Sequence, residues 1–180
     1  MVNPQLCPTL LLPLTGVRLR PWRLADASAL VVCANDEGIA QNLRDTFPFP
    51  YRPEDARWYL EFVATAGSPS IHLAIEVDSM ASGGISIVFQ EDVERRSAEI
   101  GYWLGRRCWG RGIMTAAVQT ITEYTFANFD TCRLYASIFA RNTASARVLE
   151  KSGYELEGRL RQSITKNGQT MDSLLYAKIK

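Results

Sequence analysis

The segment EIGYWLGRRCWGRG, residues 99–112, joins a strand pattern to a helix pattern through a loop that holds three glycines. Apolar residues alternate over 98–104, and from Met114 to Thr125 they recur at the i, i+3, i+4 and i+7 positions of an amphipathic helix. The first turn of a helix offers unpaired N–H groups and the positive end of the helix dipole. Glycines also let the backbone approach a ligand closely. The segment therefore predicts a strand–loop–helix unit that binds a phosphate or pyrophosphate group.

The rest of the chain shows the same two patterns in turn. The order strand, helices, three strands, helix, strand, helix and two strands predicts a mixed α/β (α+β) fold, with a mostly antiparallel central sheet of about seven strands and helices on both faces. The expected strands are 17–22, 71–77, 85–90, 98–104, 132–139, 154–165 and 170–179. The expected helices are 26–34, 37–43, 53–66, 114–125 and 142–152.

Three further expectations concern single segments. Residues 79–84 include two glycines and are expected to form a hairpin turn. His72 alternates away from the apolar row of its strand, so we expect it at the surface. The residues of the 53–66 helix that are expected to face the core are Trp58, Phe62 and Val63.

The chain has 180 residues, no internal repeat and no Gly/Ser-rich linker, which favours a single domain. We expect this domain to span residues 15–180 and residues 1–14 to form an N-terminal arm laid on its core. The start of the chain has no basic segment, is interrupted by prolines and is followed by no small-residue cleavage site, so we expect no signal peptide.

Composition removes several classes of function. Lysine and arginine number 20 against 19 aspartate and glutamate, a net charge of +1, which predicts no nucleic-acid partner. No apolar run approaches the roughly 20 residues that span a bilayer, so no membrane partner is expected. The cysteines, at 7, 33, 108 and 132, form no C-x-x-C pair and are expected to be reduced, which indicates a cytoplasmic protein. The single histidine, His72, excludes a His-rich zinc site, and we expect no metal.

The glycine-rich loop matches neither of two standard phosphate motifs. A P-loop would require Gly-Lys-Ser/Thr, and a dinucleotide fingerprint that starts at Gly110 would require Gly or Ala where Thr115 stands. On this segment alone, a plain glycine-rich turn therefore stays open. Arg106, Arg107 and Arg111 favour an anionic ligand.

A second element, further along the chain, changes this balance. It begins NTAS at 142–145 and ends VLEKSGY at 148–154. Together with RCWGRG at 107–112 it resembles the GNAT superfamily of acyl-CoA-dependent N-acetyltransferases, which carries a Gln/Arg-x-x-Gly-x-Gly/Ala loop and an Asn-x-x-Ser/Ala helix that ends in Gly-Phe/Tyr. EIGYWL at 99–104 and FPFP at 47–50 resemble the RimJ/RimL-type branch, which includes ribosomal-protein N-terminal acetyltransferases. The resemblance covers nearly the whole chain and implies the GNAT fold.

The resemblance implies acetyl-CoA as the co-substrate. Main-chain N–H groups of the loop would bind the coenzyme A pyrophosphate, and the pantetheine arm would lie where the fourth expected strand splays from the fifth. The residues implied to contact the cofactor are Trp103, Leu104, Arg107, Cys108, Trp109, Gly110, Arg111, Gly112, Ile113, Asn142 and Ser145. Two of them have structural alternatives, since Trp109 can anchor the loop to the core and Asn142 can cap the helix that follows it.

The resemblance also implies two catalytic residues. Glu99 points to the face opposite Ile100 and would act as the general base, and a solvated surface carboxylate is the alternative. Many superfamily members carry a proton-donating tyrosine seven residues after the helix asparagine, where this chain has Leu149. Ser145 would protonate the leaving thiolate instead, and a serine that bonds only to the backbone is the alternative. We expect Tyr154 to pack in the sheet.

These features predict an acetyl-CoA-dependent N-acetyltransferase that acts on a primary amine by direct attack. At pH 7 an α-amine with a pKa of about 8 is roughly 10% neutral, and a lysine amine only about 0.04%, which favours a protein N-terminal α-amine as acceptor. A small-molecule amine is the alternative acceptor, and a homodimer stays open. We expect the loop at 47–51 and the hairpin at 162–169 to build the acceptor pocket.

Two functions of other classes stay open. A non-catalytic acyl-CoA sensor would keep the fold and would bind coenzyme A without turnover. A nucleotide- or RNA-binding module would use the arginine-rich loop, and its binding would fall steeply with salt.

Overall fold

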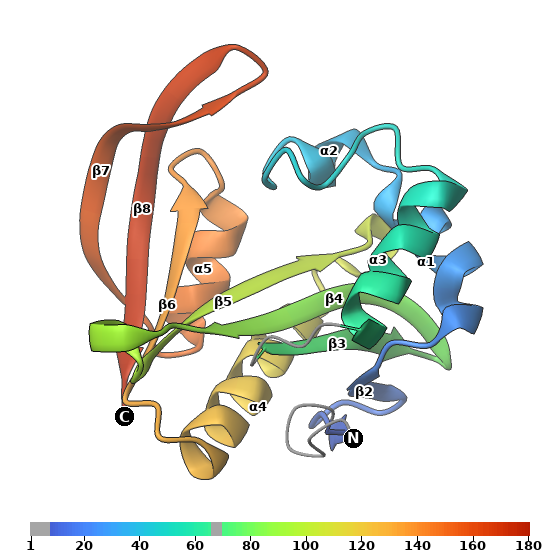
Figure 1. Ribbon diagram of the computed structural model, residues 1–180, viewed down its shortest axis with the longest axis horizontal. Helices are drawn as coiled ribbons and strands as arrows, with labels where there is room; N and C mark the ends of the chain where they lie inside the picture. The colour runs from blue at the N-terminus through green and yellow to red at the C-terminus, as the bar shows by residue number, and fades with distance from the viewer. Residues whose placement is uncertain (1–7, 66–69) are drawn as a thin grey trace.

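The computed structural model describes residues 8–65 and 70–180 (Figure 1). The expectations for Cys7, for the first half of the N-terminal arm and for the helix end at Ala66 lie outside these residues.

Strands and helices follow the expected order. The strands are β1 (Leu10–Leu11), β2 (Val17–Pro21), β3 (Ser70–Val77), β4 (Met80–Phe89), β5 (Ser97–Leu104), β6 (Arg133–Phe139), β7 (Glu155–Lys166) and β8 (Gln169–Ile179). The helices are α1 (Ala27–Ala34), α2 (Glu37–Ala40), α3 (Pro53–Thr65), α4 (Ile113–Asn128) and α5 (Thr143–Lys151). Short 3₁₀ turns lie at Leu24–Asp26, Asp92–Glu94 and Arg106–Cys108.

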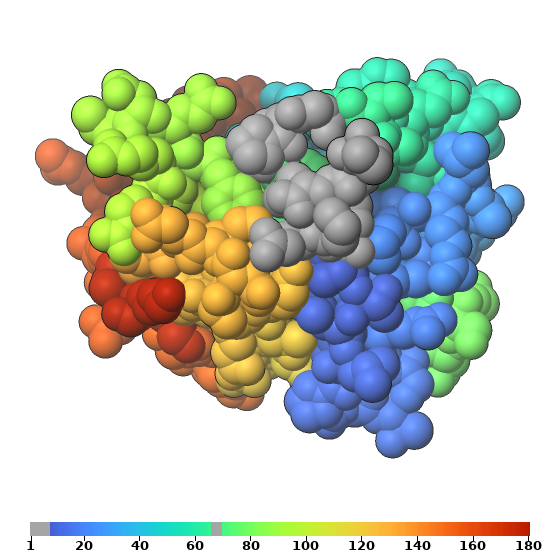
Figure 2. Space-filling model, turned by 60° about the horizontal axis from the view of Figure 1, so that its bottom comes forward, coloured from blue at the N-terminus to red at the C-terminus, as the bar shows by residue number. Residues whose placement is uncertain are grey.

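The strands of the described residues form one eight-stranded sheet in the order β1-β2-β3-β4-β5-β6-β8-β7. All neighbours are antiparallel except β5 and β6, so the predicted mixed, mostly antiparallel sheet is confirmed. The strand beyond the expected seven is β1, which belongs to the arm and pairs with β2 through Leu10↔Leu19 and Leu11↔Arg18. Figure 2 shows this blue segment beside the yellow residues of α4, where Leu12 is buried in the core.

The parallel pairing of β5 with β6 is short. It runs from Ser97↔Arg133 to Glu99↔Tyr135, although β5 continues to Leu104 and β6 to Phe139. Beyond this contact β5 stays paired with β4, and β6 stays paired with β8. The two strands therefore diverge (Figure 1), and the expected splay is present.

Helices cover both faces of the sheet, as predicted. The larger apolar cluster lies on the face of α4 and α5, where Val118 and Leu149 meet sheet residues such as Ile100 and Leu134. The smaller cluster lies on the opposite face, under α1 and α3. Its buried members are Leu30, Ala34, Tyr51, Ala56 and Leu60.

The orientation of α3 differs from the expectation. Trp58 is 63% exposed and Phe62 is 44% exposed, and their rings stack with centroids 5.5 Å apart. Val63 is only partly buried. His72, expected at the surface, is also partly buried, because its ring packs edge-on against Phe62, and burial lowers its pKa. The face that α3 buries against α1 consists of the shorter side chains Ala56 and Leu60.

The expected turn at 79–84 is wrong in its position. The turn consists of Asp78–Ser79, and β4 begins directly after it. Gly83 and Gly84 lie inside the strand because β5 passes too close for side chains there. A Cβ atom at Gly83 would lie 2.5 Å from the carbonyl oxygen of Trp103, and one at Gly84 would lie 2.8 Å from its Nε1.

A buried arginine, Arg20 on β2, holds two acidic side chains. Its guanidinium donates to the two carboxylate oxygens of Asp26 at 2.7 and 2.8 Å, and to Glu76 of β3. Burial is the largest single effect and disfavours the charged forms of Asp26 and Glu76. The hydrogen bonds and charge of Arg20, together with those of Arg23 for Asp26 and of Arg18 for Glu76, outweigh it and hold the pKa of both carboxyls below the ordinary value. The ionised cluster therefore ties β2, β3 and the turn before α1 together.

Arg20→Met should lower the free energy of unfolding by about 3–5 kcal/mol at pH 7, because the buried Asp26 loses its cationic side-chain partner and the buried Glu76 keeps only Arg18. In the parent, the charged cluster stabilises the fold above the ordinary carboxyl pKa, and this contribution is lost as the pH falls through the lowered values. In the variant the unpaired carboxyls take up protons more readily, so urea unfolding should show a smaller gap at about pH 4 than at pH 7.

Arg18→Met is the matched control. Arg18 also contacts Glu76, but its side chain is 40% exposed against 3% for Arg20. Its loss should cost at most about 1 kcal/mol. Equal losses for the two variants would contradict the role given to the buried arginine.

Candidate functional site

The loop between β5 and α4 depends on glycines in the left-handed region. Gly110 has a φ of 74° and Gly112, the N-cap of α4, a φ of 73°. A Cβ atom on either residue would meet nothing within 4 Å, so the glycines are required by backbone conformation and the space in front of them is open. The first N–H groups of α4 thus face an accessible surface, which suits the anionic group predicted for this loop.

The side chains of Cys108, Trp109 and Arg106 hold the loop in place. Cys108 is buried, and the indole Nε1 of Trp109 donates to the carbonyl oxygen of Leu104 at 2.7 Å. The Trp109 ring is 47% exposed, and the Arg106 guanidinium lies 5.0 Å from its centroid. Arg106 also donates twice to Asp36, at 2.7 and 2.8 Å, and this contact lowers the pKa of Asp36. Trp109 therefore anchors the loop through its N–H and still presents its ring to the surface.

The remaining loop residues differ in what they expose. Arg111 is exposed, and Arg107 is exposed with one guanidinium nitrogen 3.9 Å from Sγ of Cys33. Ile113 is buried, so its side chain is not available at the loop surface. Two cationic side chains therefore flank the start of α4.

Polar contacts lie at the start of α5 and join it to β5 beside the gap between β5 and β6. Asn142 caps α5, since its Oδ1 accepts from the backbone N–H of Ser145 at 3.2 Å. The Ser145 hydroxyl lies 2.9 Å from the hydroxyl of Tyr102, a residue of β5 beyond the parallel pairing. Asn142 thus has its alternative capping role, and Ser145 bonds to a side chain as well as to the backbone.

Trp103 and Leu104 use their side chains for packing. Leu104 is buried in the larger cluster, and the Trp103 ring packs against Phe47 in the smaller one, with centroids 5.5 Å apart. Since both side chains are used for packing, the backbone is the part of these residues that is left to contact a ligand.

Glu99 lies where the parallel pairing ends, with its side chain on the face opposite Ile100. Its carboxylate accepts from the guanidinium of Arg44 at 2.5 Å, and Arg44 belongs to the loop after α2. Glu99 is therefore ion-paired and partly covered, not a freely solvated surface charge. The carboxylate also contributes, after burial, to the raised pKa of its neighbour Tyr135.

Two residues near α5 have the packing roles expected of them. Leu149 is fully buried and offers no proton. The Tyr154 hydroxyl lies 2.7 Å from that of Thr122, and burial raises the pKa of Tyr154 to about 12.

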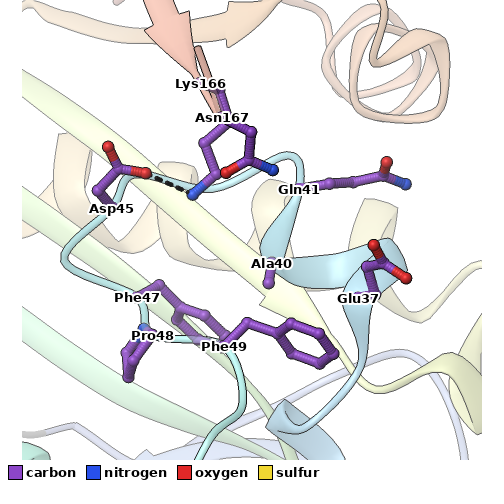
Figure 3. Close-up of a pocket in the computed structure, with 9 residues that line it drawn as sticks. All are labelled: Glu37, Ala40, Gln41, Asp45, Phe47, Pro48, Phe49, Lys166 and Asn167. Carbon is purple, nitrogen blue, oxygen red and sulfur yellow. Dashed lines mark hydrogen bonds and ion pairs between the residues drawn. The ribbon is translucent and has the colours of Figure 1, made fainter.

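A pocket of about 340 Å³ opens beside the loop that carries Arg44 (Figure 3). The predicted segments do meet there: Phe47 and Phe49 of the aromatic loop form one side, and Lys166 and Asn167 of the β7–β8 turn form the other. Lys166 donates to Asp45 at 2.7 Å, which links the hairpin to the loop. The remaining lining residues are Glu37, Ala40, Gln41, Asp45 and Pro48.

Sequence reasoning missed several residues of this site. Tertiary contacts bring Arg44, Asp45 and the α2 residues to the site, so no local sequence pattern predicts them. Tyr102 gave a weak signal, because it is the one hydroxyl in the apolar row with Ile100 and Leu104. Among residues 8–65 and 70–180, no group of three or more His, Cys, Asp or Glu side chains gathers to hold a metal, and no helix has the length and apolarity to cross a membrane.

A family model described as an acetyltransferase (GNAT) domain matches residues 17–155. The chain is 30% identical to YdaF of Bacillus subtilis over 170 residues, which cover 91% of this chain and 90% of that protein. It is 33% identical over 155 residues to the ribosomal-protein-serine acetyltransferase of Escherichia coli, with 83% of each chain covered. For p20 of Bacillus licheniformis and YjcK of Bacillus subtilis, the chain spans about half of their length, 50% and 45%.

The fold is shared with solved structures. Mycobacterium smegmatis RimJ in complex with CoA-disulfide superposes with a TM-score of 0.80 at 28% identity, over 96% of this chain and 86% of that chain.

Proposed function

The chain belongs to the GNAT acetyltransferase family, and from this premise we propose that it transfers an acetyl group from acetyl-CoA to a primary amine. The observation that carries the proposal is the arrangement around β5. An open glycine-rich loop at the start of α4 and the gap between β5 and β6 both adjoin this strand. A separate pocket is linked to it through its lining residue Phe47, which packs against Trp103 of β5.

The donor side follows from the loop and the gap. The pyrophosphate of coenzyme A binds the N–H groups at the start of α4, between Arg107 and Arg111, and the pantetheine arm enters the gap along the backbone of β5. Asn142 and Ser145 contact it from α5. The residues we assign to the cofactor are Trp103, Leu104, Arg107, Cys108, Trp109, Gly110, Arg111, Gly112, Ile113, Asn142 and Ser145.

The chemistry is direct attack of a neutral amine on the thioester carbonyl. Backbone N–H groups of β5 stabilise the charge that develops on the carbonyl oxygen. Glu99 accepts the ammonium proton, through water, after the acceptor displaces Arg44 from its carboxylate. Ser145 gives a proton to the thiolate as the carbon–sulfur bond breaks.

The acceptor that we favour is a protein N-terminal α-amine. More α-amine than lysine amine is neutral at pH 7, so the demand on a single carboxylate base is smaller. The relative in Escherichia coli, a ribosomal-protein-serine acetyltransferase by name, supports this choice. The aromatic and charged walls of the pocket suit the first residues of a peptide, and a small-molecule amine is the second candidate.

The experiment that tests the function is release of free coenzyme A thiol from acetyl-CoA in the presence of peptides, amino acids, polyamines or aminoglycosides. Turnover with N-terminal peptides above the others supports the proposal. Binding of coenzyme A without turnover on the whole panel would overturn it in favour of a sensor. Salt-sensitive RNA binding without coenzyme A affinity would indicate a nucleic-acid module.

Gly112→Val should weaken coenzyme A binding by at least about tenfold, because the side chain adds bulk where the pyrophosphate approaches the backbone. Gly168→Val is the control, since Gly168 also has a φ of 74° and open space at its Cβ position, but lies in the β7–β8 turn. Calorimetry should show normal affinity for this control. If both folded variants bind coenzyme A like the parent, the loop does not hold the pyrophosphate.

Glu99→Gln should lower kcat about 10²–10⁴-fold for a lysine-type amine, and less for an α-amine that is already partly neutral. Glutamine keeps the size of the side chain but cannot take the proton. Glu157→Gln, which breaks an ion pair with Arg133 away from the pocket, should leave kcat unchanged. Initial rates measured with both amines test this role. Equal rates for Glu99→Gln and the parent would remove Glu99 from the mechanism.

Ser145→Ala should lower kcat about 10²–10⁴-fold with little change in KM for acetyl-CoA, because its proton is needed only as the thiolate leaves. Ser152→Ala is the matched control, since Ser152 lies at the other end of α5 and donates a hydrogen bond to the Val148 carbonyl. Steady-state kinetics should leave this control at the parent rate. A Ser145→Ala enzyme with parental kcat would assign the proton to water.

A further inference from the structure

The hydroxyl of Tyr102 lies next to the hydroxyl of Ser145. On β5 it shares a face with Ile100 and Leu104, both buried in the larger cluster. Its own ring packs against the edge of that cluster, and its hydroxyl reaches the first turn of α5. Within hydrogen-bond distance of this hydroxyl lie the Ser145 hydroxyl, at 2.9 Å, and the Ser145 carbonyl oxygen, at 3.3 Å.

The position of this pair in the fold gives it a further use. Tyr102 lies beyond Glu99, the last residue of β5 that pairs with β6, so its contact joins β5 to α5 where the two strands have diverged. The backbone N–H of Ser145 is already held by Asn142, which fixes the start of α5. Ser145 is thus constrained from both sides, and its hydroxyl can take only a few orientations.

Either hydroxyl of this pair can donate to the other, so Tyr102 can be the donor only while it keeps its proton. Burial raises the pKa of its phenol above the ordinary value, so the hydroxyl keeps its proton at neutral pH. When the phenol donates to Oγ of Ser145, the serine proton must point away from Tyr102. In the proposed mechanism this proton points into the gap that holds the thioester.

We propose that Tyr102 is a positioning residue that aims the Ser145 proton at the leaving sulfur. This inference rests on the proposed function. As the carbon–sulfur bond breaks, its electron pair goes to sulfur, and the Ser145 proton passes to that sulfur to form the thiol. The Tyr102 hydroxyl stabilises the serine oxygen by donating to it, and a water molecule then returns a proton to Ser145.

Because Leu149 has no proton to donate, the proposed mechanism needs a phenol from elsewhere to support Ser145. A tyrosine on α5 at that position would bring its own acidic proton, whereas an aliphatic serine hydroxyl is a poor acid. Leu149 is fully buried and cannot assist. The phenol therefore comes from β5 in this chain and acts through Ser145.

The test compares Tyr102→Phe with Tyr154→Phe. Both remove one buried phenol oxygen that is bonded to another hydroxyl, but the partner of Tyr154 is Thr122, in α4. The two variants should lose similar thermal stability. Only Tyr102→Phe should lower kcat, by about tenfold, with an unchanged KM for acetyl-CoA, because one hydrogen bond to the reacting group is lost. Should Tyr102→Phe not fold, Tyr102→Met replaces it in the same comparison.

A double-mutant cycle separates positioning from a general structural effect. If Tyr102 acts through Ser145, Tyr102→Phe should add no further loss of kcat to Ser145→Ala. Losses that multiply, an unchanged kcat in Tyr102→Phe, or an equal loss in Tyr154→Phe would each overturn the proposal. These outcomes are read against a parent enzyme that turns over, so they differ from failure of the proposed function, in which the parent itself releases no thiol.

Discussion

The three residue pairs between β5 and β6 join the two antiparallel parts of the sheet, and the site depends on how soon they stop. Past Glu99, β5 has no strand on the side of β6, and backbone groups there need other partners. The loop into α4, the capped start of α5 and the Tyr102 hydroxyl all gather at this opening. One apolar cluster, which includes Ile87 and Leu134, spans both parts of the sheet under α4 and α5 and holds them together.

In the proposed mechanism, the opening also separates the two proton transfers. Glu99 and the acceptor pocket lie on the face of α1 and α3, whereas Tyr102 and Ser145 lie on the face of α4 and α5. An amine that enters from one face and a sulfur that departs on the other meet different groups, so no single residue has to serve as both base and acid. Arg44 compensates the charge of Glu99 in the structure, and in the proposed mechanism a cationic acceptor takes its place.

The sequence was sufficient for features that depend on neighbouring residues. The order of elements, the closing hairpin, the capping of α5 by Asn142 and the glycine-rich start of α4 follow from patterns of a few residues. Apolarity alone could not show which side of α3 is buried, and the small Ala56 lies there instead of Trp58. Gly84 resembled a turn residue, although it makes room for Trp103 of the next strand.

The rest of the site consists of contacts between residues far apart in the chain. Tyr102 and Ser145 are 43 residues apart, and Arg44 and Glu99 are 55 apart. No local pattern links such pairs, because their proximity results from the register of β5 beside β6 and from the path of the loop after α2. The residues that flank the cofactor loop could be named in advance for the opposite reason, since that loop is one continuous segment.

The lining of the acceptor pocket has an evolutionary consequence. Its residues come from α2 and the loop after it, up to residue 49, and from the end of β7 with the turn to β8. None comes from β5, α4 or α5. Mutations in these surface segments can reshape the cavity or change its charge without disturbing the strand and helices that would handle the acetyl donor. Selection can therefore exchange one amine for another in a descendant of this enzyme while the donor machinery is inherited unchanged.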